Sequence, residues 1–127
     1  MKPAHLCVLV AALVIGGCVS NQQTSGTRSA DNPQLQAAYT AYLDCLLTID
    51  DSTLSGLTVT TVPDVVDARQ GACVDSRDGY VETLGRLTMR ANRWTSLQPQ
   101  VWRRFREEAT ESTSEFLAAI LILRAEA

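Results

Sequence analysis

Histidine and lysine are nearly absent from this chain of 127 residues. Each occurs once, as His5 and Lys2, so every basic side chain after residue 5 is an arginine. Without histidine, the Ser-His-Asp and Cys-His groupings of nucleophilic enzymes are excluded from the remainder of the chain. Glycine-rich phosphate loops, dinucleotide fingerprints and zinc-binding cysteine spacings are absent as well. We therefore expect a non-enzymatic protein with no metal and no cofactor.

An apolar run of membrane-spanning length is also missing. A span needs about 20 apolar residues, whereas the run Leu6–Ile15 has about half that length. It follows a short segment that contains Lys2, and it precedes Gly16 and Gly17. A basic start, a short apolar run and small residues at a cleavage site are typical of a secretory signal peptide. We predict such a peptide over residues 1–17.

The four residues Ile15, Gly16, Gly17 and Cys18 resemble the lipobox of bacterial lipoproteins, in which an aliphatic residue and two small residues precede a cysteine. The resemblance implies cleavage before Cys18, a diacylglycerol on its thiol and, in many bacteria, a further acyl chain such as palmitate on the new terminus. Several acyl chains, at about 0.8 kcal/mol per buried methylene, hold a protein on a membrane permanently. The alternative is an ordinary cleavage site that leaves Cys18 as a free thiol.

Val19 bears on which membrane the anchor enters. In enterobacterial lipoproteins an aspartate after the lipidated cysteine resembles an inner-membrane retention signal, and this chain has Val19 at that position. The likeness therefore implies the outer membrane, with the protein facing the periplasm.

Two cysteines remain once Cys7 is removed with the signal peptide and Cys18 is acylated. In an oxidising periplasm, Cys45 and Cys73 are expected to pair as a disulfide. The chain-entropy account gives such a bridge about 3–4 kcal/mol of stabilisation for a loop of this length. Reactive thiols or a metal site are the alternatives, but two thiolates need further metal ligands and no histidine is left to supply them.

The chain after the lipobox divides into a polar segment and a domain. Residues 20–32 contain almost no apolar side chains and are rich in Ser, Thr, Gln and Asn. Such a segment buries too little surface to offset its ordering entropy, so residues 18–32 are expected to form a lipidated, flexible tether. The folded domain is then expected over residues 33–127.

Three helices are expected in this domain, and strand patterns are nearly absent. The first helix begins with Asn32 as its N-cap and Pro33 at its first position, and it is expected to end near Asp50. Residues 54–62 are expected to form a loop packed over the end of the bundle. The apolar positions of the first helix recur at helical spacing and are Leu35, Ala38, Tyr39, Tyr42, Leu46 and Ile49.

The second helix is expected to run from Pro63 to near Trp94. Its apolar side consists of Val62, Val66, Ala72, Cys73, Tyr80, Leu84, Leu87 and Ala91. Three glycines, each costing about 1 kcal/mol relative to alanine, are Gly71, Gly79 and Gly85. Residues 75–79 are its weakest part, so one long helix is favoured, with a kink or a split there as the alternative.

The third helix is expected to start at Pro99, after a boundary over residues 95–99, and to end near Arg124. Its buried stripe is expected to be Val101, Phe105, Ala109, Ser112, Phe116, Ile120 and Leu123, widened by Ala119 and Leu121. The fold class is therefore all-α, an up-down-up bundle in which the disulfide clamps the first helix to the second. Cysteines in two helices before an apolar third are similar to those of small exported bacterial proteins of unknown function, a likeness that assigns no residue a role.

Six of the ten arginines gather around the turn between the second and third helices, beside both tryptophans. This set is Arg86, Arg90, Arg93, Arg103, Arg104 and Arg106, with Trp94 and Trp102. In an up-down-up bundle this turn lies at the same end as the start of the first helix, so we expect it to face the membrane, and one hypothesis is that it contacts anionic headgroups. The sequence favours the other interpretation, a solvated face with i,i+4 pairs, in which the tryptophans cap the core. The expected pairs are Glu82–Arg86, Arg103–Glu107 and Arg104–Glu108.

Acidic residues gather toward the opposite end of the expected bundle. They are Asp44, Asp50, Asp51, Asp64 and Asp67. One hypothesis is that this end contacts a cationic protein, such as a lysozyme-like enzyme or a toxin, through long-range attraction. The favoured interpretation is that the helix dipole alone accounts for Asp64 and Asp67 in a first helical turn.

These features predict a non-enzymatic, outer-membrane-anchored lipoprotein that acts in the periplasm by binding. Its partners are membrane lipid through Cys18 and a periplasmic protein of unknown identity. The alternative function is an inhibitor or immunity protein that blocks a cationic cell-wall enzyme or toxin. The exported location and the net charge of −3 disfavour nucleic acid as a partner.

Overall fold

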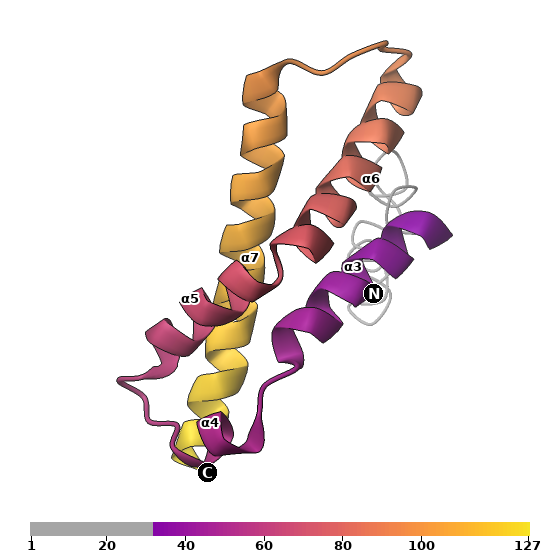
Figure 1. Cartoon of the computed structure of the whole chain (residues 1–127). Coiled ribbons are helices and arrows are strands. Elements are labelled where there is room, and N and C mark those ends of the chain that lie inside the picture. Colours follow the sequence, from indigo (N-terminus) through magenta and orange to yellow (C-terminus); the bar gives the residue numbers. More distant parts are fainter. Residues whose placement is uncertain (1–31) are drawn as a thin grey trace, which may run out of the picture. The chain divides into compact units, whose positions relative to one another are not determined.

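The computed structural model describes residues 32–127 (Figure 1). In this part of the chain helices are the only regular secondary structure, and there is no strand. Its five helices are α3 (Pro33–Leu47), α4 (Asp51–Ser55), α5 (Val62–Ala72), α6 (Val74–Asn92) and α7 (Pro99–Glu126). The all-α class is confirmed, whereas the expectation of three helices is wrong for this region. The predictions of a signal peptide, of a lipidated Cys18 and of a tether up to residue 31 lie outside the described residues.

The first helix begins at Pro33 as predicted but ends at Leu47, before Asp50. The Thr48 amide bonds to the Cys45 carbonyl at 3.2 Å, and the Thr48 hydroxyl donates to the Asp44 carbonyl at 2.6 Å. These two bonds satisfy carbonyl groups that the helix end leaves open.

A short helix, α4, occupies the start of the region predicted to be irregular. Asp50 adopts an extended conformation and is the N-cap of α4, a position that aspartate favours. Asp50, which was expected to end the first helix, therefore begins the next one. Leu54 and Leu57 then pack against the core from this connection, so it does cover the bundle.

The predicted second helix is split into α5 and α6, and the break lies at Cys73 rather than at residues 75–79. Cys73, between the two helices, has φ −111° and ψ 23°, and the chain changes direction between α5 and α6 (Figure 1). Asp75 lies in the first turn of α6, where the helix dipole favours an acidic side chain. The acidic stretch after Cys73 thus starts a helix instead of interrupting one.

The core forms where α7 runs along both α5 and α6, with α3 packed beside them. Its buried members are Tyr42, Leu46, Val62, Val66, Cys73, Val81, Ala109, Leu117 and Leu121. In the first two predicted apolar faces several positions are instead exposed, including Tyr39, Ala72 and Ala91. The expected faces were therefore broader than the buried ones.

The predicted stripe of α7 is right at Ala109 and Leu121 and wrong at Phe116 and Leu123. The buried residues of α7 are Ala109, Thr113, Leu117 and Leu121, whereas Phe116 is 47% exposed and Leu123 is 70% exposed. A row with a spacing of four residues turns gradually around a helix and forms the ridge used in oblique helix packing. Apolar residues lie along two different rows on the surface of α7. Which row is buried depends on the angle at which α7 crosses α5 and α6.

The predicted disulfide between Cys45 and Cys73 is confirmed, with a Cα–Cα distance of 5.9 Å. It joins α3 to the junction of α5 and α6. Nearby, the rings of Tyr39 and Tyr80 pack with their centroids 5.1 Å apart. Tyr39 contacts Tyr80, and Cys45, later in α3, is bonded to Cys73, which comes earlier in the chain than Tyr80. Residue numbers therefore increase along α3 while they decrease in its partner, so α3 runs antiparallel to α6.

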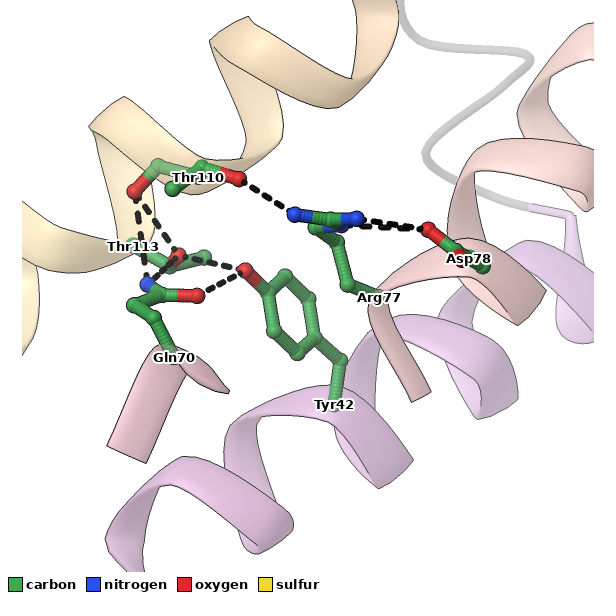
Figure 2. A network of polar contacts seen from close by, with 6 residues as sticks. All are labelled: Tyr42, Gln70, Arg77, Asp78, Thr110 and Thr113. Atoms are coloured by element: carbon green, nitrogen blue, oxygen red, sulfur yellow. Dashed lines mark hydrogen bonds and ion pairs between the residues drawn. The ribbon is translucent and has the colours of Figure 1, made fainter. Parts of the chain in front are cut away.

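A buried polar network ties α3, α5 and α7 together (Figure 2). The Tyr42 hydroxyl donates to Oε1 of Gln70 at 2.7 Å and lies 3.0 Å from Oγ1 of Thr113. The Gln70 amide donates to the hydroxyls of Thr113 and Ser114 at 2.8 and 3.0 Å. Since Tyr42 and Thr113 are completely buried, these mutual bonds are what make their polar groups tolerable in the core.

Candidate functional site

A basic helical hairpin is the strongest candidate for a functional surface. We use this name for residues 83–106, which comprise the end of α6, the connecting turn and the first turns of α7. They contain six arginines and neither aspartate nor glutamate, in a chain whose net charge is −3. This difference in charge between the hairpin and the rest of the chain can be read from the sequence, because residues 83–106 contain no acidic side chain.

The end of α6 sets the shape of the hairpin. The Trp94 amide bonds to the Met89 carbonyl at 2.8 Å, and the Arg93 amide bonds to the Arg90 carbonyl at 3.3 Å. This pair of bonds forms a Schellman motif, whose penultimate residue must adopt a left-handed conformation. Here that residue is Arg93, with φ 57°, and it is the only described residue other than glycine with a positive φ. A left-handed conformation costs a residue with a Cβ about 1–2 kcal/mol.

The basic hairpin projects beyond the start of α3. Tyr39 packs on Tyr80, and from Tyr80 the helix α6 continues to Asn92, which is about 18 Å at 1.5 Å per residue. From Tyr39 back to Pro33, α3 extends only about 9 Å in the same direction. Figure 1 shows the turn between α6 and α7 above the start of α3. The hairpin therefore has a two-helix end that α3 does not cover.

Half of the six arginines are paired with acids that flank the hairpin. Arg86 lies 3.2 Å from Glu82, and Arg104 lies 3.0 Å from Glu108. The third pair is Arg103–Glu107 at 3.8 Å. All three i,i+4 pairs were predicted, and as exposed pairs each contributes a few tenths of a kcal/mol.

The remaining arginines have no acidic partner in the part of the chain that the structure describes. Arg90 and Arg93 are exposed, and Arg106 is partly buried. Arg106 lines two open cavities between α6 and α7, each of about 440 Å³, together with Arg77 and several acids. The unbalanced positive charge therefore lies toward the end of the hairpin, at Arg90 and Arg93.

The two tryptophans are in different environments. Trp94 is 53% exposed and follows Arg93 directly, whereas Trp102 is partly buried and packs against the core. The Trp102 indole lies so close to Gly85 that a Cβ on that residue would overlap the ring. Gly85 is therefore required for this close approach, a role that no local pattern in the sequence reveals. Trp94 is the more exposed of the two.

The predicted acidic residues line more than one cavity. Asp50 and Asp51 begin α4, and Asp64 lies in the first turn of α5, where the dipole favours acids. Asp50 and Asp64 line an open cavity of about 410 Å³ with Arg69, while Asp67 lines another cavity next to α7. The Ser52 hydroxyl donates to the Asp50 carboxylate at 2.6 Å, and this bond lowers the pKa of Asp50.

Arg69 is a residue that the sequence reasoning missed. It reaches from α5 to the disulfide, where its Nη2 donates to the Cys45 carbonyl at 2.7 Å. A signal was present, because a side chain four residues before Cys73 on a helix lies on the same face as that cysteine.

Within residues 32–127, no three His, Cys, Asp or Glu side chains are grouped closely enough to hold a metal ion. In the same range, no helix combines the length and apolar character of a membrane span. No protein-family model, no curated protein and no solved structure matches this chain.

Proposed function

We propose that this chain is a non-enzymatic, lipid-anchored protein of the bacterial envelope that binds anionic phosphate groups of a membrane surface through its basic hairpin. The observation that carries the proposal is the separation of charge: residues 83–106 hold six arginines and no acid. Their end projects past α3, so a flat surface can reach them without obstruction from that helix.

The residues at this end have the chemistry of a headgroup contact. Guanidinium groups bind phosphate oxygens through two parallel hydrogen bonds, and Arg90 and Arg93 have no competing acid among the described residues. Trp94 is exposed beside them, and tryptophan is enriched where a membrane meets water. Arg93 also keeps a strained conformation that glycine would relieve, which is a pattern found at functional positions.

The position of the anchor supports the same orientation. Acylation at Cys18 ties the chain to the outer membrane on the side of α3 where Pro33 lies. The antiparallel packing of α3 and α6 puts the start of α3 and the basic hairpin toward the same end of the bundle. Anchoring and headgroup binding then act together, each keeping the other close to the surface.

The alternative function of an inhibitor or immunity protein has weaker support. It relies on a joint acidic surface, but Asp67 lines a different cavity from the one that Asp50 and Asp64 share. Asp50, Asp51 and Asp64 lie at helix starts, where the dipole accounts for them.

Vesicle binding tests the proposed function. The full chain with Cys18→Ser, which cannot be acylated, is expected to bind vesicles that contain phosphatidylglycerol. In this background, Arg90→Gln/Arg93→Gln is expected to weaken binding by about 2 kcal/mol, or about 30-fold, since an arginine near an anionic surface contributes about 1 kcal/mol. Added salt is expected to weaken binding as well, because it screens exposed charges.

The matched control removes two arginines that lie outside the hairpin. Arg77→Gln/Arg124→Gln lowers the net charge by the same amount and is expected to change vesicle binding less than twofold. Equal losses in the two double variants would show that binding follows net charge alone. No loss in the hairpin variant would show that the hairpin does not contact the membrane. Either result contradicts the proposal.

A further inference from the structure

A guanidinium group without a counter-anion lies against the Cys45–Cys73 disulfide. Nη2 of Arg69 is 3.5 Å from Sγ of Cys73 and 3.9 Å from Sγ of Cys45. Nε of Arg69 is buried and has no hydrogen-bond partner. No carboxylate of the described residues lies within ion-pair distance of this group. A partly buried charge is normally paired with an anion, so this arrangement calls for an explanation.

The surrounding charged groups do not supply that anion. Asp50, at the start of α4, and Asp64, on α5, share an open cavity with Arg69 but form no ion pair with it. On α6, Arg77 is the next charged group after Asp75, and its side chain turns away to Asp78 and Thr110. On α3, the bond from Arg69 goes to the main-chain oxygen of Cys45 rather than to a carboxylate.

The two sulfur-bearing residues differ in accessibility. Cys73 is 1% exposed, whereas Cys45 is partly exposed. An incoming thiolate therefore reaches Cys45, and the buried Cys73 is the leaving sulfur. Arg69 lies closer to this leaving sulfur, on which negative charge develops during exchange.

We propose that the Cys45–Cys73 bridge is a thiol–disulfide exchange site for a dithiol reductant, and that Arg69 stabilises Cys73 as the leaving thiolate. The inference does not depend on the proposed membrane contact. Reduction creates, next to Arg69, the anion that the oxidised protein lacks.

The exchange proceeds in two balanced steps. A thiolate of the reductant attacks Sγ of Cys45, the bond between Cys45 and Cys73 breaks, and its electron pair remains on Sγ of Cys73. The second thiol of the reductant then loses its proton and attacks the reductant sulfur of the mixed disulfide, which releases Cys45. The reductant leaves as a disulfide after giving up two electrons. Counted from its dithiol form it loses two protons: one passes to the solvent when the attacking thiolate forms, and the other is taken up by Cys45. A thiol whose anion is stabilised by a nearby cation is the better leaving group in such exchange.

The first experiment measures the rate at which dithiothreitol reduces the folded full chain. A Cys7→Ser/Cys18→Ser background leaves only the two bridging cysteines, and alkylation with mass analysis follows their release. Arg69→Gln keeps a hydrogen-bond donor but removes the charge, and it is expected to slow reduction by about three- to tenfold. Arg69→Lys keeps the charge and is expected to restore most of the rate.

The matched control is Arg77→Gln, which removes a partly buried arginine on α6 that is bonded to Asp78 instead of the bridge. It is expected to leave the reduction rate unchanged. Reduction of Arg69→Gln at the parental rate, or failure of Arg69→Lys to react faster than Arg69→Gln, would overturn the proposal.

A second measurement uses the reduced chain with Arg69 intact, so it does not depend on how Arg69 variants fold. The ultraviolet absorbance of thiolate is expected to be present at pH 7, where an ordinary thiol, with a pKa of about 8.5, is almost fully protonated. Its appearance only at more alkaline pH would overturn the proposal. Its persistence after denaturant is added would overturn it too, because the stabilisation comes from the folded position of Arg69.

Discussion

Tyr42 and Gln70 hold polar groups at the centre of the bundle, where each bond has a large effect on stability. The Tyr42 hydroxyl lies 2.7 Å from Oε1 of Gln70 and 3.0 Å from Oγ1 of Thr113. Because Tyr42 is completely buried, water cannot take the place of either hydrogen bond. In sequence these three residues are a tyrosine on an apolar face, a glutamine in a helix and a threonine among charged residues. Only their meeting across three helices gives them a common role.

Removal of this one hydroxyl is expected to destabilise the fold. Tyr42→Phe leaves buried polar atoms without their donor, at a cost of about 1–3 kcal/mol, measured by urea unfolding of the full chain. Tyr39→Phe is the matched control, because Tyr39 is 37% exposed and water can solvate its hydroxyl. Its effect is expected to stay within about 0.5 kcal/mol. Equal effects of the two changes would contradict a structural role for the network.

Two glycines on α6 are expected to respond in opposite directions to the same substitution. Gly85→Ala places a Cβ against the Trp102 indole and is expected to destabilise the protein by about 1–3 kcal/mol. Gly79→Ala meets no atom within 4 Å, so the better helix propensity of alanine is expected to stabilise by about 0.5–1 kcal/mol. Thermal unfolding of both variants checks the signs. Stabilisation by Gly85→Ala would show that Trp102 moves aside at little cost.

At the scale of the element, the end of α6 combines two opposing demands. The Schellman motif at residues 89–94 gives the hairpin a sharp turn, and glycine is the residue that suits its left-handed position. The chain has Arg93 there instead, with a positive charge and an exposed tryptophan next to it. Stability and surface chemistry therefore favour different residues at this one position.

Arg93→Gly separates these two demands. It is expected to stabilise the protein by about 1 kcal/mol, because glycine adopts a positive φ without steric cost. The same variant is expected to weaken binding to phosphatidylglycerol vesicles about fivefold, since one headgroup contact of about 1 kcal/mol is lost. Chemical unfolding and vesicle co-sedimentation measure the two effects. Unchanged binding would remove Arg93 from the proposed surface and leave its conformation unexplained.

At the scale of the whole molecule, the described bundle has two parts with different construction. Where α3, α5 and α7 meet, a disulfide and a polar network support the core. Beyond the start of α3, only α6 and α7 continue, and the close packing of Trp102 on Gly85 joins them. The first part thus holds the fold together, while the second ends in the exposed, basic turn between α6 and α7.

The residues of the candidate site could be predicted from the sequence, but which of them are buried and which are exposed could not. Arginine spacing predicts the three ion pairs, because partners four residues apart on a helix are neighbours wherever the helix lies. Trp94 and Trp102 look equivalent in sequence, and their separation into a surface and a core residue follows from packing on Gly85. Arg69 escaped notice for the same reason, since its approach to Cys45 depends on α3 lying alongside α5.

Three features follow from the sequence alone: the all-α class, the helix starts at Pro33 and Pro99, and the pairing of Cys45 with Cys73. These features depend on local backbone preferences or on the small number of available cysteines. Tertiary structure decided which row of α7 is buried, where α5 ends and α6 begins, and which charged groups lack a partner. Each of these depends on contacts between residues far apart in the chain, and helical periodicity describes one helix at a time without specifying how two helices cross.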